Sequence, residues 1–241
     1  MHMDMNAMTP YGQALYDYYN GNKEAMITIR RDDNVSAELP VWIFFNEEAN
    51  FSVIERKALE SCRGRVLDAG AGSGRHSLYL TGRGFETTSI DISGEAVEIM
   101  KKRGLKEVYC KSIFDFNDGG FDTILLLLHG IGMVGTLEGF ERFLAHAGTI
   151  INPGGVIIFD SLDVKCTNDP ENLKYQEQNI RQNRYIGEIH MQFEYKGIAG
   201  KPFSWLHLDP ETLKNQVSAL GWQHKIIHQE ASGDYLVVLY K

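Results

Sequence analysis

The chain has 241 residues and a formal net charge of −8, and 43% of its residues are hydrophobic and 23% charged, as in an ordinary globular protein. The acidic charge disfavours a nucleic-acid partner, because it repels a phosphate backbone. The three cysteines lack CxxC spacing, which predicts neither a disulfide framework nor a metal site, and no apolar run is long enough to cross a membrane. We therefore expect a cytoplasmic protein without nucleic-acid, membrane or metal partners, and nothing in the sequence indicates its oligomeric state.

The first 52 residues form an aromatic-rich segment ahead of the first core strand. Apolar residues at helical spacing around Leu15 predict a short helix that ends before Gly21. Because the segment precedes the core, we expect residues 1–52 to lie as a helical lid across the mouth of a cofactor cleft. Its aromatic side chains either pack in the core or contact a substrate. The candidate substrate contacts are Tyr11, Tyr18 and Tyr19.

The next part of the chain alternates between helical and strand patterns. An amphipathic helix is predicted over Phe51–Glu60, strands end at Leu67, Ile90 and Cys110, and helices begin at Arg75 and Ser93. Ser93 is a good N-cap residue, and the basic run before Gly104 suits the negative end of a helix dipole. That placement explains the basic run without a polyanionic partner.

The second half continues the alternation and then departs from it. We predict an apolar strand over 121–128, a helix capped by Thr136, a turn over 152–155, a strand over 156–159, and a last helix beginning at Asp209-Pro210. Between them, residues 162–207 are polar and alternate in hydropathy, which predicts two or three inserted antiparallel strands. The four residues between 222–228 and 235–240 can join only antiparallel neighbours. The pattern predicts an α/β domain whose parallel sheet closes with a hairpin.

A glycine-rich turn, Asp68-Ala69-Gly70-Ala71-Gly72-Ser73-Gly74, joins the first core strand to its helix. Such a turn lets a cofactor approach the backbone at the helix N-terminus. A dinucleotide fingerprint requires glycine or alanine at position 75, where this chain has Arg75. With Asp91 ending the second strand and the closing hairpin, the chain resembles the class I S-adenosylmethionine (SAM)-dependent methyltransferases.

The resemblance implies a three-layer α/β/α Rossmann-like fold with a mostly parallel seven-stranded sheet, formed by a SAM-binding domain over 53–241 with the small β insertion at 162–207. It implies that the glycines and Asp68 hold the methionine moiety of SAM and that Asp91 accepts hydrogen bonds from both ribose hydroxyls. Ser112 stands where an acidic residue commonly meets the adenine. The cofactor residues implied are Asp68, Ala69, Gly70, Gly72, Gly74, Asp91, Ile92, Ser112, Ile113 and Leu128.

These residues predict methyl transfer from SAM to a small-molecule acceptor, leaving S-adenosylhomocysteine (SAH). The acceptor pocket is expected between the N-terminal segment, the loop from His129 and the 162–207 insertion. His129, at a strand end, is either the catalytic base and a substrate contact or a hydrogen-bonded supporting residue. Two alternatives remain: a non-catalytic SAM-binding or interaction module, and an NAD-dependent oxidoreductase, which the glycine spacing disfavours.

Overall fold

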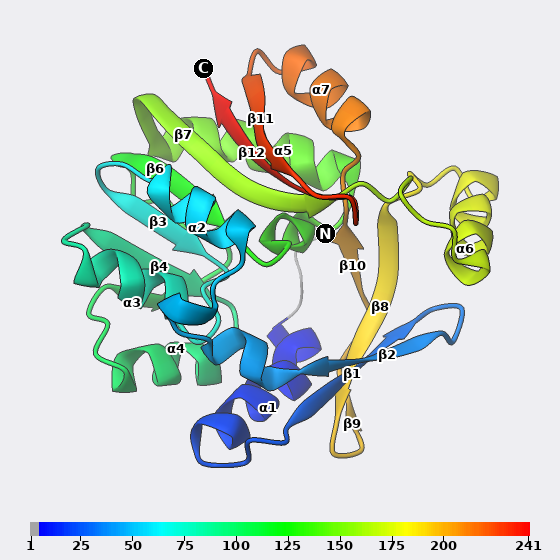
Figure 1. Ribbon diagram of the computed structural model, residues 1–241, viewed down its shortest axis with the longest axis horizontal. Helices are drawn as coiled ribbons and strands as arrows, with labels where there is room; N and C mark the ends of the chain where they lie inside the picture. The colour runs from blue at the N-terminus through cyan, green and yellow to red at the C-terminus, as the bar shows by residue number, and fades with distance from the viewer. Residues whose placement is uncertain (1–4) are drawn as a thin grey trace.

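Two β-sheets form the framework of the protein in the computed structural model, which describes residues 5–241 (Figure 1). The larger, seven-stranded sheet has the order β11-β12-β7-β6-β3-β4-β5. These strands are β3 (Val66–Ala69), β4 (Thr87–Asp91), β5 (Val108–Cys110), β6 (Phe121–Leu126), β7 (Ile151–Leu162), β11 (Gln223–Gln229) and β12 (Asp234–Tyr240). The two pairs that involve β12, with β7 and with β11, are antiparallel, and the other pairs in this sheet are parallel. The predicted parallel sheet with its closing hairpin is confirmed.

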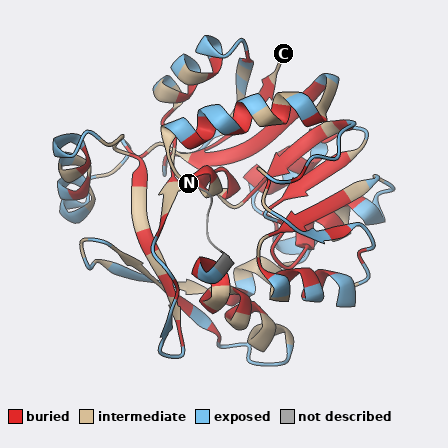
Figure 2. Ribbon diagram, turned by 180° about the vertical axis from the view of Figure 1, so that it is seen from behind, coloured by how far each residue is buried: buried red, intermediate tan, exposed pale blue. Residues whose placement is uncertain are grey.

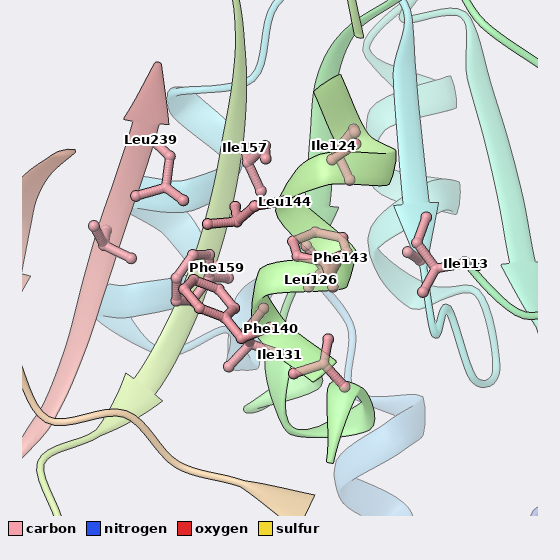
Figure 3. Close-up of a cluster of buried hydrophobic side chains, with 14 of the residues drawn as sticks. Ile113, Ile124, Leu126, Ile131, Phe140, Phe143, Leu144, Ile157, Phe159 and Leu239 are labelled. Atoms are coloured by element: carbon pink, nitrogen blue, oxygen red, sulfur yellow. The ribbon is translucent and has the colours of Figure 1, made fainter. Parts of the chain in front are cut away.

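Helices cover both faces of this sheet, and the alternation of side chains along β7 shows how. Ile157 and Phe159 lie in one buried cluster with α5 (Leu137–Ile150) and α7 (Pro210–Ala219) (Figure 3). Val156 and Ile158 lie in another with α2 (Val53–Glu60) and α3 (Arg75–Gly82). Because successive side chains on a strand point to opposite faces, one strand contributes to both clusters. The three-layer arrangement follows, with buried strands between partly exposed helices (Figure 2).

The helix starts follow the predicted capping signals. Ser93 Oγ accepts a hydrogen bond from Ala96 N at the start of α4 (Gly94–Lys102), and Thr136 and Asp209 cap α5 and α7 in the same way. These caps satisfy backbone N–H groups that have no partner inside the helix. Among residues 5–241, no helix combines the length and the apolar character required to cross a bilayer.

A second, antiparallel sheet has the order β10-β8-β1-β2, with β9 also paired to β8. It joins β1 (Met26–Arg31) and β2 (Ser36–Pro40) to β8 (Glu188–Tyr195), β9 (Ile198–Ala199) and β10 (Phe203–Leu206). The inserted strands are confirmed, as is the N-terminal helix, α1 (Thr9–Tyr19), but β1 and β2 were not predicted. Figure 1 shows this sheet below the carboxyl ends of the larger one. The N-terminal segment and the insertion therefore form one structural unit.

Three local features differ from the sequence predictions. The insertion carries an unpredicted helix, α6 (Pro170–Arg181), capped by Asp169. The strand expected over 121–128 ends at Leu126, because Leu128 and His129 adopt left-handed φ angles of 58° and 56°. The turn expected over 152–155 is an irregularity within β7, where the pairing with β6 shifts register.

The described residues also contain four 3-10 helices: η1 (Met5–Met8), η2 (Val41–Phe45), η3 (Glu48–Asn50) and η4 (Gly130–Val134). The first four residues of the expected lid lie outside the described part of the chain. Ser73 in the glycine turn donates to the carbonyl oxygen of Phe44 in η2. The N-terminal segment is thereby connected directly to the glycine turn.

Candidate active site

A cavity of about 820 Å³ lies between the carboxyl ends of the larger sheet and the inner face of the second sheet, within the range of small-molecule sites. Many of the predicted site residues line it: Tyr11, Asp68, Gly70, Gly72, Asp91, Ile92, Ser112, Ile113, Leu128 and His129. Four others are not among the lining residues: Tyr18, Tyr19, Ala69 and Gly74. Tyr18 instead stacks on Phe45, with ring centroids 4.7 Å apart.

The glycine turn exposes its backbone to this cavity. Gly70, Gly72 and Gly74 all have positive φ angles, of 74°, 57° and 80°. A Cβ atom at Gly72 would lie 2.8 Å from the hydroxyl of Tyr11, which is closer than a carbon atom can approach without displacement. Glycine is therefore required at position 72 both for its conformation and for the close approach of a second group.

Asp91 is buried at the end of β4 and accepts two backbone hydrogen bonds. Its Oδ2 accepts from Gly72 N and its Oδ1 from Ser93 N, both at 2.9 Å. Burial raises the pKa of Asp91 to about 6, although the two hydrogen bonds oppose that shift. Each carboxylate oxygen keeps a further lone pair. Asp91 can therefore accept two more hydrogen bonds, as a pair of neighbouring hydroxyls requires.

Asp68 and Ser112 order the turns on either side of Asp91. Asp68 accepts a 2.6 Å hydrogen bond from the hydroxyl of Ser77, and burial raises the pKa of Asp68. Ser112 Oγ accepts from Phe114 N at 3.2 Å, so this serine closes the turn after β5. Beside it, Ile92 and Ile113 present apolar surface to the cavity. This part of the cavity can hold a flat apolar ring.

A buried ion cluster at the base of the glycine turn was missed by sequence reasoning. Glu55 on α2 pairs with Arg75 on α3, and His76 Nε2 lies 2.8 Å from Glu55 Oε1. All three side chains are at least nine-tenths buried, and all three line the cavity. Burial alone would raise the pKa of Glu55. The hydrogen bond to His76 and the Arg75 guanidinium outweigh that effect and lower the pKa to about 2. The only sequence signal was the capping box that Glu55 completes with Ser52.

His129 also lines the cavity and lies between two carboxylates. Its Nε2 is 2.9 Å from Asp234 Oδ1 and 3.6 Å from Asp160 Oδ2. Burial alone lowers the pKa of His129, but the hydrogen bond to Asp234 and the charge of Asp160 outweigh it and raise the pKa. His207, in edge contact with His129 at 5.3 Å, has its pKa lowered to about 3 by burial and by His129. The positively charged form of His129 is thus favoured, and His207 stays neutral.

The second sheet closes the cavity with apolar side chains. Ile29 comes from β1, Leu39 from β2, Met191 and Phe193 from β8, and Trp205 from β10. None of these five was predicted as a site residue, because the pairing of β1 with β8 joins segments far apart in the chain. Within residues 5–241, no group of three or more His, Cys, Asp or Glu side chains has the arrangement of a metal site.

The donors and acceptors of this cavity fit SAM. A buried carboxylate with free lone pairs, an exposed glycine backbone and an apolar surface beside them match a ribose, an amino-acid end and an adenine, respectively. When bound, SAM supplies an electrophilic methyl group. The fold and the site thus define a class I SAM-dependent methyltransferase.

Comparisons with known proteins lead to the same class of protein. A family model described as "Methyltransferase domain" matches residues 44–226. A SAM-dependent methyltransferase from Bacteroides fragilis, solved in complex with SAH, is 32% identical with a TM-score of 0.85, over 99% of this chain and 97% of that one. The CcbJ methyltransferase from Streptomyces caelestis shares the fold, at 12% identity and a TM-score of 0.59, over 81% of this chain and 98% of its own.

A curated relative, YqeM of Bacillus subtilis, is 26% identical over 105 residues, which are 41% of this chain and 42% of YqeM. The chain therefore spans less than half the length of that relative. The family match covers most of the chain, and the Bacteroides structure covers nearly all of it. The chain belongs to the SAM-dependent methyltransferase family, and its methyl donor is SAM.

Proposed function

We propose that this chain transfers the methyl group of SAM to a small-molecule acceptor bound between the two sheets. The observation that carries the proposal is the continuity of the cavity, which runs from Gly72 and Asp91 to the apolar wall of β8 and β10. The residues that fit the donor and the apolar side chains of the second sheet line the same cavity. Bringing two reactants together in one enclosed site is the main contribution that such a protein makes to catalysis.

The N-terminal segment supports a small acceptor, because it closes the cavity over the glycine turn. Tyr11 of α1 lines the cavity and packs edge-on against Phe44 of η2, with centroids 5.3 Å apart. Arg103 donates to Ser73 O at 2.9 Å and to Ser73 Oγ at 2.8 Å, which fixes the turn below this cover. We assign the described part of the N-terminal segment, residues 5–52, as a lid, with Tyr11 as its substrate or cofactor contact.

We further propose roles for the predicted site residues. Asp91 holds the ribose, the glycine turn with Asp68 holds the amino-acid end, and Ile92, Ser112 and Ile113 hold the adenine. Because His129 donates its Nε2 proton to Asp234 and its charged form is favoured, its placement supports a positioning role over that of a base.

The proposal is tested in two stages. Calorimetric titration with SAH, SAM and NAD should show binding of the first two and not of NAD. SAH release from SAM is then measured with pools of small amines, alcohols, thiols and carboxylates, and in parallel with mixed proteins and RNA. Turnover with a small-molecule pool supports the proposal. Methylation of protein or RNA alone, or SAM binding without turnover on any acceptor, would contradict it.

A further inference from the structure

The carboxylate of Asp160 is incompletely satisfied within the cavity. Its side chain is 7% exposed, and its Oδ2 accepts a 3.0 Å hydrogen bond from His129 N. Its Oδ1 is buried and has no hydrogen-bond partner within the part of the chain that the structure describes. A buried acceptor without a donor destabilises a protein unless a ligand supplies that donor. Asp160 is also one of the residues that line the cavity.

Charge around Asp160 is predominantly negative. Asp160, Asp234 and Glu230 all line the cavity. The cations that act on Asp160 include His129 and the Arg75 guanidinium, which already pairs with Glu55. His207 stays neutral, because burial and the charge of His129 keep its pKa near 3. An anionic group here would meet three carboxylates, while the Arg75 guanidinium is already paired with Glu55. A neutral or cationic hydrogen-bond donor fits.

Another part of the cavity wall is apolar and closely packed. The indole of Trp205 lies against the loop after β6, where a Cβ atom at Gly132 would come within 2.0 Å of Trp205 Nε1. Phe193 and Phe203 pack edge to face, with centroids 5.0 Å apart, and Met191 and Phe193 face the cavity. An acceptor is thus offered apolar contacts on one side and an unpaired carboxylate oxygen on the other.

We propose that the acceptor is an apolar amine, whose hydrocarbon body packs on Met191, Phe193 and Trp205 and whose nitrogen donates a hydrogen bond to Asp160 Oδ1. This inference rests on the proposed function and names its substrate class. The amine reacts in its neutral form: the nitrogen lone pair forms the bond to the methyl carbon, and the carbon–sulfur bond breaks with its electron pair left on sulfur. Asp160 takes the proton that the nitrogen then loses.

The test uses a matched set of probes on protein saturated with SAH: 2-naphthylmethylamine, 2-naphthylmethanol, 2-naphthoate and methylamine. Calorimetric titration should give the naphthyl amine the tightest binding, at least about tenfold tighter than naphthoate, because hydrogen bonds to charged groups contribute that much or more. Methylamine, which lacks the apolar body, should not bind measurably. This ranking in the wild-type protein needs no variant.

Asp160→Asn tests the residue itself, since the amide oxygen can still accept from His129 N. The variant should bind the naphthyl amine at least about tenfold more weakly than the wild type does. It should bind naphthoate at least as well as the wild type and leave the Kd for SAH unchanged. Asp163→Asn is the control, because it removes an equal charge three residues away and Asp163 is not a lining residue. It should change none of these values.

Three results would overturn the inference: equal binding of amine and naphthoate by the wild type, tightest binding of the alcohol, or equal losses of SAH and amine affinity in Asp160→Asn. The last result would assign Asp160 to the amino group of the donor. Absence of SAH binding by the wild type would instead refute the proposed function. The two failures are therefore distinguishable.

Discussion

His129 and Asp234 form a contact between two strand ends that lie 105 positions apart in the chain, with Nε2 2.9 Å from Oδ1. Asp234 begins β12, the strand that pairs antiparallel with β7, so the closing hairpin supplies a group to the cavity. The hydrogen bond to His129 lowers the pKa of Asp234 to about 2. The pair thus helps to hold the left-handed turn that ends β6.

Asp234→Asn should lower the pKa of His129 and destabilise the protein in a pH-dependent way. The raised pKa of His129 adds stability that is fully present below pH 6.5 and is lost as the pH rises through the pKa of the folded state. The lowered pKa of Asp234 adds stability that is fully present above pH 3.8. The loss should therefore be largest near pH 5.5, at about 1 kcal/mol after allowance for partial exposure, and smaller at pH 9. Urea unfolding at both pH values and histidine NMR titration measure it.

Ser232→Ala is the matched control for that pair. It removes the 2.7 Å hydrogen bond to Asp234 Oδ2 and leaves the carboxylate beside His129. Its effect on stability should be the same at both pH values. Equal losses for Asp234→Asn at pH 5.5 and pH 9 would show that the pair is not charged.

Asp91→Asn should weaken SAH binding by about 10- to 150-fold, the range expected for hydrogen bonds to a charged group. In the wild type, SAH affinity should fall as pH drops below about 6, where Asp91 takes up a proton, by up to about tenfold per pH unit. The variant should lack this pH dependence. Calorimetry from pH 5 to pH 8 checks both statements.

Much of the fold was predictable because its signals are local. Apolar runs such as that of β6, caps such as Ser93 and the glycine turn each act within a few residues. The pairing of β1 with β8 could not be predicted, because Arg30 and Glu194, which form an ion pair across these strands, are 164 positions apart in the chain. Neither segment specifies its partner. The helix α6 was missed for a different reason. Its Asp-Pro start matches that of α7, but only Tyr175 and Asn179 in it are buried, so its apolar periodicity is weak.

The site divides in the same way. Asp68 and Asp91 lie at the ends of strands that the sequence marks, the glycines follow the first of these strands, and most of these residues line the cavity. The partners of His129 could not be predicted, since Asp234 reaches it only through the hairpin register. The left-handed turn at Leu128 and His129 is also unmarked, because such turns are usually signalled by glycine.

Glu55→Ala should destabilise the protein strongly, by about 3–5 kcal/mol, because it leaves Arg75 buried without its counter-ion. The change also removes the capping box at the start of α2. Glu60→Ala, at the exposed end of the same helix, should change stability by no more than about 0.5 kcal/mol. Urea unfolding of the three proteins measures the difference. A loss below 1 kcal/mol for Glu55→Ala would show that water or a rearranged partner compensates Arg75.

Three glycine-to-alanine changes should separate backbone strain from crowding near the cofactor turn. Gly74 has a φ of +80°, and a Cβ atom there would lie 2.7 Å from both Leu105 Cδ1 and Met100 Cγ. Gly84 has a φ of +88° with no atom within 4 Å, and Gly82 lies at the end of α3 with neither constraint. Gly84→Ala should therefore destabilise by about 1–2 kcal/mol, the strain of a left-handed residue. Gly74→Ala should destabilise by about 1–3 kcal/mol more, from overpacking, and Gly82→Ala should be neutral or slightly stabilising. Equal losses at 74 and 84, measured by chemical denaturation, would mean that Leu105 and Met100 move aside without strain.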